Sequence, residues 1–195
     1  MLREAGHEVR TPDLEMRDAS AGIDDHAEQV VDAVGDLRDV VLVGHSYAGL
    51  PIAVAADRVP ERLARVVYLD AFAPRDGESG VAQRPELLKS FVPRARDGLL
   101  PPIPPEYAGA NEADYELLRA RTATTPLRCW TDPVRLTGAG ERVPRAYIWC
   151  TRSGFGKVAA RLREDPTWDF HTLDTQHMAM YTAPRELADL LLELA

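Results

Sequence analysis

The stretch VVLVGHSYAG, residues 40–49, decides the fold of this chain. Its four aliphatic residues in a row are typical of a strand that is covered on both faces of a sheet. A Gly-His-Ser turn follows directly, and residues 47–63 then form an Ala-rich, helix-compatible run. This order of strand, tight turn and helix predicts that Ser46 stands on a sharp turn at the carboxyl end of a strand.

Small residues around Ser46 support a strained turn. A nucleophile elbow has the form Gly-x-Ser-x-Gly, in which small residues let the strand and helix pack closely. Gly44 occupies the first small position and Ala48 the second, with Gly49 one residue later. In such a turn the Tyr47 N–H points toward the oxyanion of a reacting carbonyl group. The alternative interpretation is a serine that caps the N-terminus of a helix.

The rest of the chain alternates between strand and helix patterns. Helix spacing and β-branched runs predict an α/β fold with a mainly parallel sheet flanked by helices. The predicted strands are residues 7–14, 39–46, 63–72, 144–151 and 168–173, and the predicted helices besides 47–63 are residues 24–37, 157–165 and 184–195.

Residues 77–142 interrupt this alternation. The segment is rich in proline and has room for short helical pieces such as residues 112–121, but it contains no repeated strand–helix unit. We therefore expect one domain over residues 1–195 with a helical lid inserted at about 77–142, because so few apolar positions would make a marginal core for a second domain.

Composition limits the classes of partner. The 195 residues carry a formal net charge of -8, which argues against nucleic acid and anionic membrane surfaces as partners. No apolar run reaches the roughly 20 residues of a membrane span, and the first ten residues contain no signal-like stretch, so we expect a cytoplasmic protein. Cys129 and Cys150 make no disulfide framework and are expected to be reduced. The histidines are scattered, so the sequence indicates no metal site.

A general base for Ser46 is available at His177. This histidine follows the last predicted strand and precedes the last helix, which is the position of the base in the chain order Ser, acid, His. His45 is expected to pack or hydrogen-bond locally. His26 is expected to lie solvated on a charged helix face.

With these residues in place, the chain resembles the α/β-hydrolases that include methylesterases and hydroxynitrile lyases, over nearly its whole length. The resemblance is carried by residues 40–79, TPLRCWTDPVRLTG (125–138), VPRAYIWCT (143–151) and QHMAM (176–180). It implies an α/β-hydrolase fold, with Ser46 as nucleophile and His177 as base. Lyases of this family have Lys directly after the histidine, so Met178 points to the esterase branch.

The catalytic acid departs from the family pattern. The family has Asp where this chain has Ser153, and a serine cannot stabilise an imidazolium as a carboxylate does. Asp70, at the end of the predicted strand 63–72, is a substitute on the same sheet edge, although it could instead cap the loop that follows. Asp174 is a weaker candidate. Restoring the pattern with Ser153→Asp is expected to raise activity if that position still faces His177.

The N-terminus departs as well. The family begins with a strand ending in His-Gly and a loop that gives the second oxyanion N–H, whereas this chain starts at MLREAGHEV. We therefore expect an upstream start, a shortened chain or re-paired strands. Residues 7–14 would then pair directly with the inner strand 39–46, or another chain would fill the gap. An open sheet edge also favours self-association into a homo-oligomer.

The resemblance and the residues together predict carboxylic ester hydrolysis through an acyl-enzyme on Ser46, with a small-molecule ester or apolar ligand as partner and no cofactor. Trp130 and Met178 are the expected substrate-binding residues, and Phe91, Tyr107 and Tyr115 are further candidates for the lid pocket. Two alternatives stay open: a non-catalytic binder that has kept the pocket, and a weakly active fragment that needs a partner chain.

Overall fold

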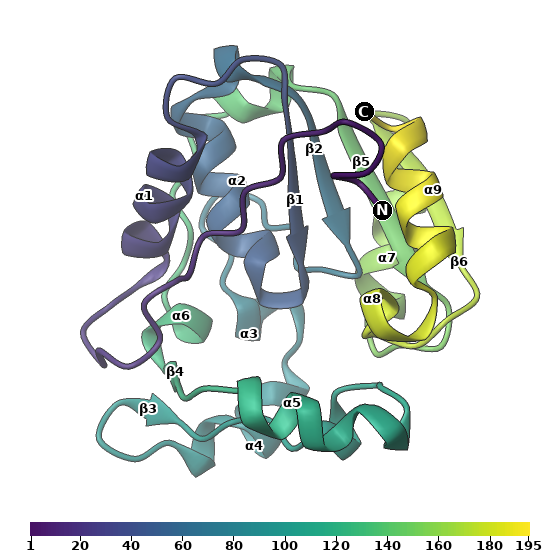
Figure 1. Cartoon of the computed structure of the whole chain (residues 1–195). Coiled ribbons are helices and arrows are strands. Elements are labelled where there is room, and N and C mark those ends of the chain that lie inside the picture. Colours follow the sequence, from purple (N-terminus) through teal and green to yellow (C-terminus); the bar gives the residue numbers. More distant parts are fainter.

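The sheet of this protein has four parallel strands in the order β1-β2-β5-β6 (Figure 1). The computed structural model describes residues 1–195, apart from the side chains of Leu88 and Tyr107. The predicted strands 39–46, 63–72, 144–151 and 168–173 are confirmed, and their observed bounds are β1 Val40–His45, β2 Leu63–Leu69, β5 Arg145–Cys150 and β6 Trp168–Leu173.

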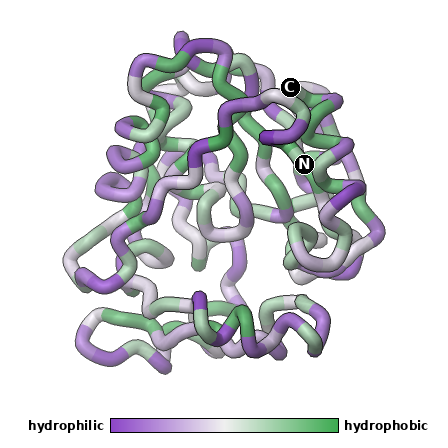
Figure 2. Tube along the Cα trace, in the orientation of Figure 1, coloured by the Kyte–Doolittle hydropathy of each residue, from purple (hydrophilic) through white to green (hydrophobic). Residues whose placement is uncertain are grey.

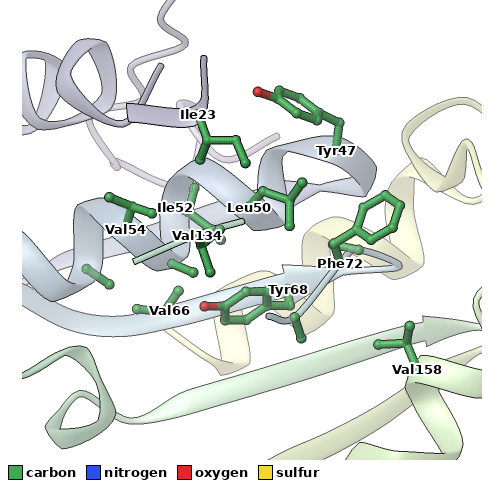
Figure 3. Close-up of a cluster of buried hydrophobic side chains, with 14 of the residues drawn as sticks. Ile23, Tyr47, Leu50, Ile52, Val54, Val66, Tyr68, Phe72, Val134 and Val158 are labelled. Atoms are coloured by element: carbon green, nitrogen blue, oxygen red, sulfur yellow. The ribbon is translucent and has the colours of Figure 1, made fainter. Parts of the chain in front are cut away.

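Helices cover both faces of the sheet. Alternation along β2 sends Val66 and Tyr68 into a cluster with α1, α2 and α7, whereas Val67 and Leu69 pack against α8 and α9 on the other face. Figure 3 shows the first cluster, with the side chains of α2 above those of β2. The bounds are α1 Ile23–Val34, α2 Gly49–Arg58, α7 Gly156–Arg163, α8 Ala179–Thr182 and α9 Pro184–Glu193. Helices α1, α2, α7 and α9 confirm the helical runs expected from the sequence, whereas α8 was not expected.

We call residues 77–142 the inserted segment. Most of it lies beyond the carboxyl ends of the strands (Figure 1), whereas its last turn, Ala139–Arg142, packs beside the C-terminal end of α2. The helix expected at 112–121 forms as α5, preceded by a short 3-10 turn. A small antiparallel ribbon, β3–β4, was not expected from the sequence. The elements are α3 Gly80–Gln83, α4 Glu86–Ser90, β3 Leu99–Leu100, α5 Tyr115–Arg121, β4 Thr125–Pro126 and α6 Arg128–Thr131.

The N-terminal segment corrects the sequence-based expectation. Residues 7–14 form no strand but run irregularly beside α1, where Arg10 donates to the Ala33 carbonyl oxygen at 2.9 Å. β1, expected as an inner strand, lies at the edge of the described sheet, and Val43 is 40% exposed. The expected pairing of residues 7–14 with β1 is therefore wrong, because these residues run irregularly beside α1 instead of extending alongside the strand. Pairing of β1 with another chain stays a prediction.

Hydrophobic and hydrophilic stretches alternate along the chain (Figure 2). None of the helices in the described part of the protein is both long and apolar enough to cross a membrane.

Candidate active site

Ser46 occupies a strained turn between β1 and the 3-10 turn η1 (Ser46–Ala48). Its φ is +55°, a left-handed conformation that residues other than glycine seldom adopt. Gly44 has no room for a side chain, because a Cβ there would lie 2.5 Å from the Ile52 side chain. A Cβ on Gly49 would lie 1.9 Å from the Phe72 carbonyl oxygen. The two glycines let strand and helix pack closely around the turn, as the elbow pattern predicts.

Ser46, His177 and Asp70 form a continuous hydrogen-bonded chain. His177 Nε2 lies 2.9 Å from Ser46 Oγ, and His177 Nδ1 lies 2.6 Å from Asp70 Oδ2. Ser46 and His177 are 131 positions apart in the sequence, and Asp70 lies between them. Each of the three follows the carboxyl end of a parallel strand, so the fold brings them to one edge of the sheet. The arrangement therefore has the order of a nucleophile, a base and an orienting acid.

The Asp70 carboxylate is fully buried and has three donors. Oδ1 accepts from the Ser153 hydroxyl at 2.8 Å and from the Cys150 N–H at 3.2 Å, while Oδ2 faces His177. Buried charges of this kind need such donors. Ser153, at the position where the family has its acid, thus supports Asp70 instead of replacing it.

The weaker acid candidate lies away from the base. Asp174 is exposed and accepts from the Thr151 hydroxyl at 3.1 Å, with Arg152 at 3.3 Å. Of the two carboxylates considered from the sequence, Asp70 is therefore the one that contacts His177.

Two rings enclose the His177 imidazole. His45 lies at 4.4 Å between ring centroids on one side, and Phe155 stacks at 5.3 Å on the other. His45 Nε2 also lies 2.9 Å from the His177 carbonyl oxygen, so its hydrogen bond reaches across the chain and is not local as expected. Burial, together with the neighbouring His177, lowers the pKa of His45 to about 3. The His45 ring is therefore neutral near pH 7, and Nε2 must carry the proton because its partner is a carbonyl.

Tyr47 is anchored by a histidine that the sequence analysis placed in solvent. His26 is fully buried, which corrects that expectation, and its Nε2 donates to the Glu15 carbonyl oxygen at 2.6 Å. Its Nδ1 is thereby left to accept from the Tyr47 hydroxyl at 2.7 Å. Figure 3 shows the Tyr47 ring directed away from β2. His26 lies four residues before the buried Val30 on α1, a spacing that could have indicated an inward-facing side chain.

The Tyr47 backbone serves a different purpose from its side chain. Tyr47 is the second residue of η1, and the first N–H groups of a helical turn have no partner inside it. Because the Tyr47 N–H has no partner inside the turn and lies next to Ser46, it is available to a reacting group.

The predicted pocket residues differ in burial, and Trp130 and Phe91 are the most buried of those described. Trp130 packs against Tyr47, Phe72 and Phe91 with ring centroids 5.3 to 5.7 Å apart, beneath the elbow. Tyr115 is half-buried on α5, and the Tyr107 side chain lies outside the described part of the structure. Met178 is half-buried, and its N–H donates to the carbonyl oxygen of Gly109 at 2.9 Å.

The cysteines are buried and unpaired with each other, as expected. Burial raises the pKa of Cys129 to about 11 and that of Cys150 to about 12. Both thiols therefore stay protonated near neutral pH and are poor nucleophiles compared with an activated serine.

A cavity of about 230 Å³ with a mixed polar and apolar lining lies elsewhere, between α2, β2 and the loop before β5. Its lining includes Asp57, Tyr68 and Trp168 but none of the three residues of the hydrogen-bonded chain. It is therefore separate from the candidate active site.

The fold and this site define an α/β-hydrolase. The pattern of the "Alpha/beta hydrolase family" matches residues 2–190, and the chain belongs to that family. It is 31% identical over 218 residues to a carbendazim hydrolyzing esterase from Nocardioides sp. (strain SG-4G), covering 99% of this chain and 90% of that protein.

Two further relatives point the same way. Methylesterase 9 from Arabidopsis thaliana is 27% identical over 231 residues, with 100% of this chain and 90% of that protein covered. A solved extracellular α/β-hydrolase from a Paenibacillus species superimposes with a TM-score of 0.86 at 25% identity, covering 98% of this chain and 89% of the other. The resemblance to esterases of this fold is thus confirmed, and these relatives support ester hydrolysis.

Proposed function

We propose that this protein hydrolyses small-molecule carboxylic esters through an acyl-enzyme on Ser46. The observation that carries the proposal is the unbroken hydrogen-bonded chain from Ser46 through His177 to Asp70. A serine is a weak nucleophile by itself and needs an adjacent base that is in turn oriented by a third group.

Each residue has a defined part in the two steps. His177 Nε2 takes the Ser46 proton as Oγ attacks the ester carbonyl carbon, and it returns that proton to the alcohol as the C–O bond breaks. Water, deprotonated by the same nitrogen, then attacks the acyl carbon. The proton passes from Nε2 to Ser46 Oγ as the acyl C–O bond breaks, which releases the carboxylic acid and restores the serine. Asp70 holds the Nδ1 proton throughout, which keeps Nε2 free to accept and stabilises the imidazolium.

The Tyr47 N–H stabilises the oxyanion of each tetrahedral intermediate. It is the single oxyanion donor that we assign among the described residues. The inserted segment, residues 77–142, acts as a lid over the ester, with Trp130 and Met178 bordering the pocket.

A non-catalytic binder was considered because Ser153 occupies the family's acid position. The contact between Asp70 and His177 removes that reason, since a carboxylate already holds the base. Hydrolysis therefore accounts for the geometry better than binding alone.

A fluorophosphonate probe tests the proposal. Wild-type protein is expected to be labelled and to hydrolyse p-nitrophenyl acetate, and Ser46→Ala is expected to abolish both. Ser90→Ala is the matched control, because Ser90 is an exposed serine on α4 that makes no contact with His177. Labelling that survives Ser46→Ala would show that another residue is modified, and a wild type that neither labels nor turns over would favour the binder.

A further inference from the structure

One peptide unit beside the base is held from two directions. The carbonyl oxygen of His177 accepts from His45 Nε2 at 2.9 Å, and the N–H of the next residue, Met178, donates to the carbonyl oxygen of Gly109, also at 2.9 Å. His45 is the residue before Ser46, whereas Gly109 belongs to the lid. The loop that carries the base is therefore tied to both the elbow and the lid.

Gly109 approaches His177 more closely than any other residue type could. Its φ is +65°, and a Cβ built on it would lie 2.9 Å from the His177 Cβ and 3.0 Å from the His177 backbone nitrogen. Real Cβ atoms do not come so close without something shifting. Gly77, at the start of the lid, has a similar φ of +77°, but nothing lies within 4 Å of a Cβ built there.

The His45 bond is durable. Because this ring is neutral and donates from Nε2, the bond does not depend on its gaining or losing a proton near pH 7. The His45 ring also lies against the His177 ring at a tilt of 36°, which adds a second contact between the same two residues. The elbow side of the clamp is thus joined to the base by two contacts, whereas the lid side is joined by the Gly109 hydrogen bond.

We propose that His45 and Gly109 are positioning residues, and that their clamp on the His177–Met178 peptide couples the position of the lid to the alignment of the base. This inference rests on the proposed role of His177. When the lid is seated, Gly109 holds Met178 and so keeps His177 Nε2 directed at Ser46. When the lid is displaced, that hydrogen bond is lost and the base is held from the elbow side alone.

The main test compares Gly109→Ala with Gly77→Ala. Both variants place Ala at a positive φ in the lid, but only the first meets His177. A misplacement of about 1 Å in a catalytic group can cost about 10²-fold in rate. We expect Gly109→Ala to lower kcat for p-nitrophenyl acetate by about 10- to 100-fold with little change in KM, and Gly77→Ala to stay close to wild type. Equal kcat values for the two folded variants would refute the coupling.

The elbow side is tested with His45→Gln and His45→Leu. Gln keeps an N–H donor near the place of Nε2, whereas Leu keeps bulk without a donor. We expect Leu to lower kcat by about tenfold or more and Gln to recover most of that loss. If both variants only lower the melting temperature, with unchanged kcat for the folded protein, then His45 is structural and the proposal is wrong on this side.

A readout that does not need turnover separates this inference from the proposed function. The proton on His177 Nδ1, bonded to Asp70, should give a far-downfield proton NMR signal. We expect this signal in wild type and Gly77→Ala, and its broadening or shift in Gly109→Ala. An inactive wild type with this pattern would overturn the proposed function but keep the clamp, whereas an unchanged signal in Gly109→Ala would overturn the clamp.

Discussion

Replacing Ser153 by Asp restores the residue that the family has at this position. Higher activity was expected only if position 153 faces His177, whereas in the structure Ser153 contacts Asp70. Ser153 Oγ donates to the buried Asp70 at 2.8 Å. The substitution removes a hydrogen bond to a charged group, worth about 1.5–3 kcal/mol. It also puts a second carboxylate beside the first, and two like charges 4 Å apart repel by about 4 kcal/mol at an effective dielectric constant of 20. We therefore expect Ser153→Asp to lower both stability and activity at pH 8.

Asp70→Asn tests the same contact from the other side. The Cys150 N–H is a fixed donor to Oδ1, so the amide oxygen of Asn should take that place. The amide NH₂ would then face His177 Nδ1 and force the ring proton onto Nε2, where it blocks proton transfer from Ser46. In a serine protease this change of tautomer lowers kcat by about 10⁴, and we expect a loss of about 10³ to 10⁴ here.

The assay is p-nitrophenyl acetate hydrolysis at pH 8, with melting temperature measured in parallel. Ser153→Ala is the matched control, since it removes the hydrogen bond without adding a charge, and it should lie between wild type and Ser153→Asp in both measurements. The double variant Asp70→Asn, Ser153→Asp should regain activity over Asp70→Asn alone, because the carboxylate then stands at the family's position. Asp70→Asn within tenfold of wild type, or Ser153→Asp more active than wild type, would refute the reasoning.

Three further outcomes follow from the geometry around the elbow. Gly49→Ala should destabilise the protein by about 1–3 kcal/mol or more, because its Cβ meets a backbone carbonyl at 1.9 Å. Gly77→Ala should lose only the cost of its backbone strain, since nothing lies near a Cβ there. Equal melting temperatures for the two variants would contradict this prediction. Tyr47→Phe should cost about 1–3 kcal/mol in urea unfolding, since buried His26 Nδ1 loses its donor, and an unchanged midpoint would show that the bond is dispensable. Between pH 6.5 and about 3, His45 binds a proton in the unfolded chain but not in the folded protein. The free energy of unfolding should therefore fall as pH is lowered, by about 1.4 kcal/mol per unit of pKa shift. His45→Gln should flatten this pH dependence in urea unfolding, and a pH dependence equal to that of wild type would exclude His45 as the source.

The main elements of the fold were predictable because the secondary structure that each sequence favours is also the one that the packed sheet and helices need. The apolar runs of β1, β2 and β5 are typical of sheet strands, and the helices between them show apolar faces at helical spacing. Residues 7–14 failed as a strand because a strand pattern needs a neighbour to pair with, and pairing is not encoded in the pattern itself.

Contacts between side chains distant in the sequence were harder to predict. His26 and His45 are each near a polar or charged neighbour along the chain, which favoured an exposed or local interpretation. Their partners lie 21 and 132 positions away, on elements whose packing is decided by the whole fold. The lid glycine at 109 gave no signal at all, because its importance comes from the residue it touches and not from its surroundings in the sequence.

The sequence predicted the positions of Ser46 and His177 but left the catalytic acid open. Asp70 and position 153 follow neighbouring strands, β2 and β5, whose carboxyl ends lie side by side, and their side chains meet within 2.8 Å. A carboxylate at either place can therefore reach the same imidazole, and the sequence alone offers two solutions to one geometric requirement. What decides between them is burial: at Asp70 the charge is enclosed and receives three donors, one of them from Ser153 itself. With Ser153 in place of the family's aspartate, a hydroxyl donates to Asp70 at the position where a second carboxylate would repel it. Ser153 and Asp70 therefore act together as one acid site.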